Sequence, residues 1–458
     1  MDTAVILAAG KGSKIYPFSE TMPKAALPLG DKSVIEYQVT TLKKLGLRKI
    51  IVVVGHLKGQ IYSALKDFED IMFIEDREIL GTAKSLLNVL KHFEDLDKFL
   101  VIYGDIFVSE ETLKKVIDKA KRGADYVALT VPLRSERPND WICSKNNGDE
   151  IEYVLAHARH RVSHRLGGIY VLNSGFRKYL ESNPGFMLHV PVGVMPPREF
   201  YLEESIAIAI DDGEIFKTVE PDDDFFVDID KPWHIIEANM KYLDYFFSKL
   251  EKSIIEENAN ISEDAEILGK IVAKSGSKIK KGAEIRGGAI IGRNTIIGKC
   301  ILNGKVSIND YSIVDEFCRI ESHTVVGKKV KILHAAEVGG VIMDGVSIVH
   351  YSEIYGVIGR YTDIGAATVV GTLKFDDSPA LIRIKGRKEF PPRFGNGAYI
   401  GDFCRTGVNA IIMPGVRVGP YSAIGPGVIL YEDIPPRTLV LAKQELIKKE
   451  WGPEKYGW

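Results

Sequence analysis

The first third of the chain alternates short, continuous apolar runs with segments in which apolar residues recur every three or four positions. The runs are rich in Val, Ile and Phe and have the length of strands that are buried on both faces. Helices are predicted between them, for example over Val34–Leu45 and Glu110–Lys121. This alternation indicates an α/β domain with a Rossmann-like, mainly parallel sheet. Its predicted strands are Ala4–Leu7, Lys49–Val54, Ile71–Ile74, Phe99–Tyr103 and Tyr126–Val131.

From about Ile261 onward the hydrophobic period changes to six. This is neither a helix period nor a two-residue strand period, and it predicts a triangular, left-handed parallel β-helix in which each aliphatic side chain points inward. Glycine often follows the aliphatic residue, as a tight corner requires. One uninterrupted series consists of Ile308, Val314, Ile320, Val326, Ile332 and Val338, and the last consists of Ile400, Thr406, Ile412, Val418, Ile424 and Leu430.

Interruptions of these patterns predict the domain organisation. The longest break in the six-residue series, Lys374–Gly397, predicts a projecting loop. Pro232–Leu250 has helical spacing and is expected to join the two halves, and Leu441–Trp451 is expected to form a helix that caps the coil. We therefore divide the chain into an α/β domain (1–235), a linker helix (236–258), a β-helix (259–436) and a helical tail (437–458).

Composition narrows the class of protein. The formal net charge of the 458 residues is -2, so neither nucleic acid nor an anionic membrane is an expected partner. No apolar segment has the length of a membrane span, and a cytoplasmic location is the expectation. The cysteines are scattered without a C-x-x-C pair and are interpreted as small buried residues: Cys143, Cys300, Cys318 and Cys404.

The first predicted strand leads directly into a glycine-rich turn, Ala8-Ala9-Gly10-Lys11-Gly12-Ser13-Lys14. Such a turn lets backbone N–H groups approach a triphosphate, and Lys14 and Lys24 can neutralise its charge. The alternative is a turn that needs glycine for steric reasons alone. The turn lacks the third glycine of a dinucleotide-binding loop and the Gly-Lys-Ser/Thr ending of a Walker A loop.

The turn, with Pro23-Lys24 downstream, resembles the sugar-1-phosphate nucleotidyltransferase family, and the resemblance continues along the chain. Leu80-Gly81-Thr82-Ala83 is similar to the family's base-contacting turn. Tyr103-Gly104-Asp105 and Val227-Asp228-Ile229 look like its two metal-binding aspartates. With the β-helix included, the chain resembles the bifunctional N-acetylglucosamine-1-phosphate uridylyltransferase/glucosamine-1-phosphate acetyltransferases and their archaeal relatives.

This resemblance implies an enzyme that joins an NTP and a sugar 1-phosphate and releases pyrophosphate, with Mg²⁺ as cofactor. In-line attack on the α-phosphorus needs charge neutralisation, which Lys24 and a metal held by Asp105 and Asp228 would supply. The substrate-binding residues that it implies are Ala8, Ala9, Gly10, Gly12, Gly81 and Thr82. The alternative interpretations are that both aspartates cap strand ends and that Lys24 is a solvated surface lysine.

The chain also departs from the family's pattern. Lys14 stands where the family usually has arginine, so a bidentate donor fork is lost. The family's Glu-Lys-Pro, which holds the sugar, is absent near Ala156-His157-Ala158, and Leu166-Gly167-Gly168 replaces its Asn-Ala-Gly. Asp76 is a candidate for reading the base but does not distinguish UTP, GTP and dTTP. A basic cluster follows, which would suit an acidic or heavily phosphorylated substrate or form a solvated loop: His157, Arg159, His160, Arg161, His164 and Arg165.

For the coil, the resemblance implies a histidine base for acetyl transfer, with acetyl-CoA as co-substrate. His350 matches that histidine, but Glu353 and Thr372 stand where the relatives have tyrosine and asparagine. The alternative is a coil that serves only oligomerisation, since triangular coils pack their flat faces into trimers. A further alternative for the whole chain is a non-catalytic regulatory or scaffold homologue, which the missing Glu-Lys-Pro favours and Lys24, Asp105 and Asp228 oppose.

Overall fold

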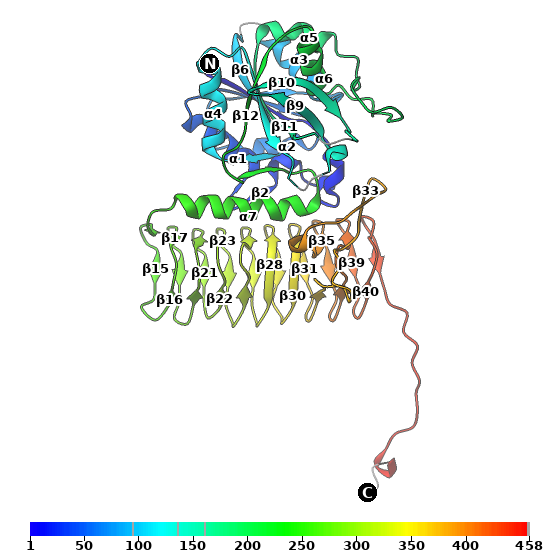
Figure 1. Ribbon diagram of the computed structural model, residues 1–458. Coiled ribbons are helices and arrows are strands. Elements are labelled where there is room, and N and C mark those ends of the chain that lie inside the picture. Colours follow the sequence, from blue (N-terminus) through cyan, green and yellow to red (C-terminus); the bar gives the residue numbers. More distant parts are fainter. Residues whose placement is uncertain (94–95, 135–136, 160–161, 456–458) are drawn as a thin grey trace.

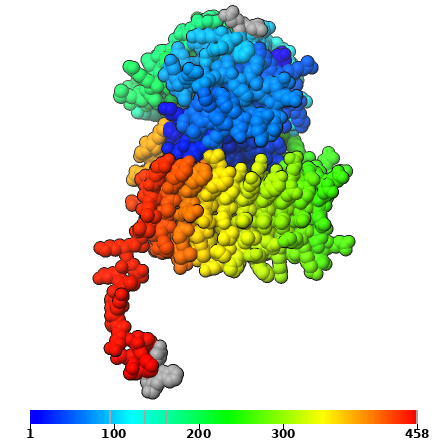
Figure 2. Space-filling model, turned by 180° about the vertical axis from the view of Figure 1, so that it is seen from behind, coloured from blue at the N-terminus to red at the C-terminus, as the bar shows by residue number. Residues whose placement is uncertain are grey.

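The computed structural model describes residues 1–93, 96–134, 137–159 and 162–455. It consists of two bodies, an α/β domain and a long coil of short strands, with one helix, α7 (Pro232–Lys249), lying along the coil between them (Figure 1). Seen from behind, the earliest part of the chain rests directly on the coil, and the C-terminal tail leaves the body (Figure 2). Among the described helices, α7 included, none combines the length and the apolar character that crossing a bilayer requires.

The α/β domain is built on a nine-stranded mixed sheet. Parallel pairing joins β5 to β4, β4 to β1, β1 to β6 and β8 to β12, whereas β11 and β10 run antiparallel to their neighbours. The sheet is therefore mainly parallel, and each of the five predicted strands is confirmed to within one residue at each end. The spatial order is β5 (Ile71–Glu75), β4 (Lys49–Val54), β1 (Thr3–Ala8), β6 (Lys98–Tyr103), β11 (His164–Asn173), β8 (Tyr126–Pro132), β12 (Phe216–Val219), β10 (Glu150–Ala156) and β9 (Ile142–Asn147).

Helices cover both faces of this sheet, which explains the continuous apolar runs. Along β1, Val5 and Leu7 belong to one buried cluster, while Ala4 and Ile6 belong to another on the opposite face. The first cluster is completed by α3 (Thr82–His92), α5 (Arg177–Glu181) and α6 (Leu202–Asp211), and the second by α1 (Val34–Lys44), α2 (Lys58–Ala64) and α4 (Glu110–Lys121). The predicted helices α1 and α4 are confirmed.

The coil consists of parallel strands, most of two or three residues, from β14 (Ile254–Ile255) to β41 (Leu439–Val440). The predicted aliphatic positions stack on one another in adjacent turns of the coil: Ile279 pairs with Ile297, Ile297 with Val314, and Val314 with Ile332. All four are buried. The six-residue period is thus confirmed as the repeat that fills the interior of the coil.

Two six-residue strands explain the shifts in the series after Val338 and Ile354. In β28 (Glu337–Ile342) and β30 (Glu353–Ile358) the chain passes a corner without the usual turn, so the next inward residue comes four positions later. Gly340 and Gly356 make this possible, with φ of 101° and 122°. A Cβ on either glycine would lie 2.1 Å from a carbonyl oxygen of the next turn of the coil.

The two bodies share a buried cluster centred on α7. Its members come from α7, from the β2 (Pro28–Leu29) and β3 (Lys32–Ser33) region, and from one face of the coil. Polar contacts reinforce it: Asp31 lies 2.8 Å from Lys274 of the coil, and Arg360 donates to the Thr21 carbonyl oxygen at 2.9 Å. Tyr16, just beyond the glycine turn, donates to the Ile434 carbonyl oxygen at 2.9 Å. The loops of the α/β domain are therefore docked on the coil.

The break at Lys374–Gly397 is confirmed as an excursion from the coil. It contains a hairpin of β33 (Ile382–Ile384) and β34 (Arg387–Glu389), followed by a turn of 3-10 helix over Arg393–Gly395. The coil closes beneath it, because Gly356 of β30 pairs directly with Ala398 of β35 (Ala398–Ile400). The hairpin rises beside the end of α7 toward the α/β domain (Figure 1).

The prediction of a helix over Leu441–Trp451 is wrong. Residues 441–450 form neither helix nor strand, and Pro453–Lys455 form only a turn of 3-10 helix. Leu441, Leu446, Ile447 and Trp451 are all exposed, so no packing surface supports the apolar face of a helix. A segment of this length is marginally helical at best without such packing.

Candidate active site

The glycine turn follows β1 at the carboxyl edge of the sheet. Ala8 and Ala9 are buried, which fixes the start of the turn. Gly12 has a φ of 63°, and a Cβ there would lie 2.9 Å from Cγ of Lys24. Nothing lies within 4 Å of a Cβ built on Gly10. Glycine is thus required at position 12 both by the backbone conformation and by the lysine that crosses it.

Lys24 lies at the centre of a charged cluster with Lys14, Asp105 and Asp230. Its Nζ is 2.9 Å from Oδ2 of Asp105 and 3.4 Å from Oδ1 of Asp230. Lys14 holds the other oxygen of Asp230 at 2.9 Å. Burial alone would lower the pKa of Lys24, but the Asp105 and Asp230 carboxylates outweigh it and raise the pKa well above its ordinary value. Lys24 is therefore a permanent cation in this cluster.

Two short strands bring Asp105 and Asp228 together from distant parts of the chain. β7 (Ile106–Val108) pairs antiparallel with β13 (Phe226–Asp228), so that Asp228 lies opposite Ile106. The Ile229 N–H group also donates to the Asp105 carbonyl oxygen at 3.0 Å. Burial, and then the charge of Asp105, raise the pKa of Asp228 to about 7, while Arg165 opposes them. The two predicted aspartates are thus close enough to repel each other.

This donor set fits a divalent cation. Carboxylate oxygens are the ligands that Mg²⁺ prefers, and a cation between Asp105 and Asp228 would remove the repulsion that raises the Asp228 pKa. Within the described residues, no group of three or more His, Cys, Asp or Glu side chains is arranged to hold a metal. Asp105 and Asp228 would therefore leave coordination positions for phosphate oxygens and water, as is usual for Mg²⁺ in nucleotide sites.

A cavity of about 740 Å³ lies beside the glycine turn, and we call it the nucleotide cavity. Its walls are residues 9–13, the turn Ile79–Thr82, and two segments before α6, 184–186 and 198–200. Gly81 has a φ of 131°, and a Cβ there would lie 2.6 Å from the Phe200 carbonyl oxygen. Thr82 accepts a hydrogen bond from the Leu202 N–H group at 2.8 Å. The structure thus places Gly10, Gly12, Gly81 and Thr82 around one cavity.

Asp76 is not part of that cavity, which corrects its predicted role in reading the base. The side chain is buried, and its two oxygens accept hydrogen bonds from the Ile79 N–H group at 3.0 Å and the Ser85 hydroxyl at 2.5 Å. Asp76 therefore holds the turn that presents Leu80 and Gly81. The lining residues that sequence reasoning missed are those of the segment 184–200, which carries no recognisable motif.

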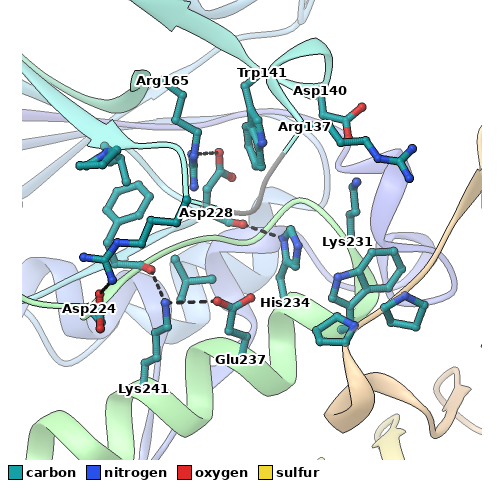
Figure 3. Close-up of a pocket in the computed structure, with 18 of the residues that line it drawn as sticks. Arg137, Asp140, Trp141, Arg165, Asp224, Asp228, Lys231, His234, Glu237 and Lys241 are labelled. Carbon is teal, nitrogen blue, oxygen red and sulfur yellow. Dashed lines mark hydrogen bonds and ion pairs between the residues drawn. The ribbon is translucent and has the colours of Figure 1, made fainter. Parts of the chain in front are cut away.

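A second cavity, of about 640 Å³, begins at Asp228 and shares no lining residue with the first (Figure 3). We call it the acceptor cavity. Its α/β wall includes Trp141, Arg165 and Lys231, and the Arg165 guanidinium lies 3.8 Å from the centre of the Trp141 ring. An Arg165 nitrogen is 3.6 Å from Asp228. The coil excursion supplies the opposite wall with Glu389, Phe390, Pro391, Pro392 and Phe394.

The described members of the predicted basic cluster lie in different environments. Arg165 reaches the acceptor cavity, but His164 pairs with Glu220 at 2.8 Å, and His157 lies 3.0 Å from the Asn139 carbonyl oxygen, outside the cavity lining. Arg159 is exposed, and His160 and Arg161 lie outside the described residues. His157 has a φ of 54°, so its conformation indicates a turn. The cluster was interpreted either as a site for an acidic substrate or as a solvated loop, and its described members divide between the two, because Arg165 lines the acceptor cavity and Arg159 is exposed.

Gly168 precedes the stretch of β11 that pairs with β6, next to Tyr103. A Cβ there would lie 2.9 Å from the Tyr103 ring. The hydroxyl groups of Tyr103 and Tyr170 both donate to the buried carboxyl of Glu203, at 2.7 and 2.8 Å. Burial raises the pKa of Glu203. Gly168 thus packs under this tyrosine network and does not line either cavity.

Comparison with known proteins bears on both halves. Residues 4–172 match the family of MobA-like NTP transferase domains, and residues 397–431 match the bacterial transferase hexapeptide family. A relative from Sulfurisphaera tokodaii, named bifunctional sugar-1-phosphate nucleotidylyltransferase/acetyltransferase, is 30% identical over 94% of this chain and 98% of its own. Proteins named bifunctional protein GlmU from Methanococcus vannielii and Thermotoga petrophila are 29% and 27% identical, over 98% and 99% of this chain and 99% of their own lengths.

The chain belongs to the family of bifunctional sugar-1-phosphate nucleotidyltransferases. Membership spans both domains, so the predicted fold class is confirmed: a Rossmann-like sheet followed by a left-handed β-helix of hexapeptide repeats. The family resemblance that the glycine turn suggested is confirmed with it.

On the coil of this family member, His350 lies on the surface next to another histidine. Nδ1 of His350 is 3.2 Å from Nδ1 of His334, which occupies the preceding turn of the coil. Glu353, where the predicted pattern has tyrosine, is exposed at the start of β30. The structure thus places His350 where a substrate in solvent can reach it, beside a second imidazole.

Proposed function

We propose that the α/β domain transfers a nucleotidyl group from an NTP to a sugar 1-phosphate, forming a nucleotide sugar and pyrophosphate. An oxygen of the sugar phosphate attacks the α-phosphorus, and the bond to the β-phosphate oxygen breaks as pyrophosphate leaves. The observation that supports this proposal is the position of the Lys24, Asp105 and Asp228 cluster, which meets the glycine turn on one side and the acceptor cavity on the other.

The residues of this chain would divide the work as follows. The glycine turn offers backbone N–H groups to the phosphates, as Gly10 and Gly12 leave room for close approach. Lys24 and Lys14 stabilise the negative charge that moves onto the leaving pyrophosphate. Asp105 and Asp228 would hold Mg²⁺, which when bound neutralises phosphate oxygens of both substrates. Two cavities on either side of this cluster keep the two substrates in line.

Pyrophosphate release tests this proposal. The protein is incubated with Mg²⁺ and each of UTP, GTP, dTTP, ATP and CTP, paired with a panel of sugar 1-phosphates. We expect turnover with at least one pair, its loss in EDTA, and its loss in Asp105→Asn. Asp118→Asn, a change of the same type on the surface of α4, serves as the matched control. A folded protein without turnover on any pair would favour the non-catalytic scaffold.

A second activity is proposed for the coil: N-acetylation of an amino-sugar phosphate by acetyl-CoA. The amine nitrogen attacks the thioester carbonyl, the carbon–sulfur bond breaks, and His350 takes the proton that the nitrogen loses. The exposed His334–His350 pair supports this, because the second imidazole can orient the first. CoA release should disappear in His350→Ala and persist in His92→Ala. Release that survives His350→Ala would remove this histidine from the reaction.

We also propose that the coil assembles into trimers in the cytoplasm. Exposed aromatic rings stack along one corner, with Phe403 5.4 Å from Tyr361 and 5.0 Å from Tyr421 between ring centres. Such a continuous apolar column invites burial against a second copy. Light scattering coupled to size-exclusion chromatography should give three times the 50.9 kDa chain mass, and a monomer would contradict the proposal.

A further inference from the structure

The excursion of the coil, residues 374–397, lies against the α/β domain. The coil's own strand ladder is continuous without it. Strand pairing passes directly from β30 to β35, so the 24 residues between Lys374 and Gly397 could be absent without leaving a gap in the ladder. Instead, the buried side chains Ile382 and Ile384 join the cluster that contains Ile229 and Trp233. The excursion is therefore anchored in the α/β domain directly beside the residues that follow Asp228.

Its strand β34 places a carboxylate on a lysine of the acceptor cavity. Oε2 of Glu389 lies 2.5 Å from Nζ of Lys231, and both side chains are largely shielded, with 15% and 11% of their surfaces exposed. A second contact joins Arg387 to Asp140 at 2.7 Å. A shielded, close ion pair holds both partners in one geometry. Lys231 thus presents a fixed donor beside the fixed acceptor of Glu389.

Next to this pair the excursion turns apolar side chains toward the cavity and not into its own interior. Phe390 is 52% exposed and Phe394 is 37% exposed, and both line the acceptor cavity together with Pro391 and Pro392. Trp141 and Arg165 form the facing wall (Figure 3). A cavity between domains with apolar walls and a few fixed polar groups is typical of small-molecule binding.

We propose that the excursion completes the sugar site of the nucleotidyltransfer reaction, with Lys231 and Glu389 replacing the absent Glu-Lys pair. The ammonium group donates to, and the carboxylate accepts from, neighbouring hydroxyl groups of a hexopyranose, whose apolar face rests on Phe390. Glu389 also positions Lys231. The second domain therefore sets the sugar specificity of the first. This inference rests on the proposed function.

Steady-state kinetics on the full chain test it, with pyrophosphate release measured for the sugar 1-phosphate that turns over best in the panel. Glu389→Gln and Phe390→Ala should each raise the KM for the sugar 1-phosphate about tenfold, with the KM for the NTP unchanged. Glu389→Asp, which keeps the charge, should recover part of the loss. Lys388→Gln changes the adjacent exposed residue of β34 and should have no effect.

The controls separate this inference from the proposed function. Thermal unfolding shows whether each variant is folded, and NTP binding shows whether the first cavity is intact. Wild-type turnover with an unchanged sugar KM in both variants would overturn the inference and leave the function standing. If the wild type has no turnover, the inference is tested by measuring the binding of glucose 1-phosphate and N-acetylglucosamine 1-phosphate by calorimetry. Binding that Glu389→Gln weakens would support the sugar site alone, and equal binding or none would overturn it.

Discussion

The nucleotide cavity and the acceptor cavity lie near the same charged cluster but are built differently: Lys24 crosses Gly12 of the first, and Asp228 lines the second. The first is lined by segments of the α/β domain alone, whereas the second takes one wall from α7, β8, β11, β13 and the loops beside them and the other from the coil excursion. The nucleotide cavity therefore requires only that one domain folds. The acceptor cavity requires in addition that two domains dock. This difference predicts that substitutions can weaken the binding of one substrate without weakening the binding of the other.

The largest effect is expected at Lys24, which crosses the glycine turn at Gly12 and contacts Asp105. Lys24→Ala should lower kcat/KM by about a thousandfold, because it removes the buried cation that we propose stabilises the reacting phosphates. Pyrophosphate release at saturating NTP measures it. Lys66→Ala, a surface lysine beyond α2, should behave as the wild type. A loss below tenfold in Lys24→Ala would mean that the cluster is not the reaction centre.

A loss of about a hundredfold is expected for Asp228→Asn, together with a gain in stability. The Asp228 pKa is raised to about 7 in the folded protein, so wild-type stability falls as pH rises from about 4 to 7. The amide has no charge to bury, and the variant should be more stable than the wild type at pH 8, by about 1 kcal/mol or more, and equal at pH 4. The free energies of unfolding of both proteins, measured with denaturant at pH 4 and pH 8, test this prediction.

A stability effect without a nucleotide-binding effect is expected at the docking surface. Lys32 and Lys274 overcome the effect of burial and lower the pKa of Asp31 to about 2. The contribution of Asp31 is then present above pH 4 and lost as pH falls toward 2, by about 2 kcal/mol. Asp31→Asn should remove this part of the acid transition while NTP binding at pH 7 stays unchanged. Weakened NTP binding would show that docking also shapes the first cavity.

The smallest effect is expected for Lys14→Arg, which restores the family's usual residue. Lys14 is partly exposed and contacts Asp230 through one nitrogen, so a guanidinium can make the same contact. The kcat should change by no more than about threefold, whereas Lys14→Ala should lower it by about tenfold. Equal losses in both variants would show that this position tolerates only an ammonium group.

The sheet and the coil could be predicted because each has a hydrophobic period that extends over many residues. Lys24, Asp105 and Asp228 were proposed from motifs that resemble those of the nucleotidyltransferase family, and the structure brings the three side chains into one cluster. Asp230 was missed, although it lies two positions after Asp228 and hence on the same side of an extended segment. It could not be singled out because the segment is rich in aspartates, with Asp222, Asp223 and Asp224 in the loop before it.

The remaining errors have a common physical origin in tertiary packing. Asp76 has the residue type to read a base, but a short polar side chain before a turn is also the usual partner of that turn's N–H groups, and here this role prevails. The contact of Glu389 with Lys231 joins residues 158 positions apart in different domains, so no local sequence pattern predicts it. Whether the apolar face of 441–451 is covered likewise depends on a surface outside that segment.

Because β30 pairs directly with β35, the number of turns in the coil determines where the excursion stands along the coil axis, and hence where its wall of the acceptor cavity lies. Each turn of the coil advances by one strand spacing of about 4.8 Å, and α7 fixes where the α/β domain rests along that axis. Removing one complete turn between α7 and the excursion would leave every ladder intact, yet would carry Glu389 about 4.8 Å away from Lys231. The number of repeats before position 374 therefore fixes whether Glu389 can reach Lys231.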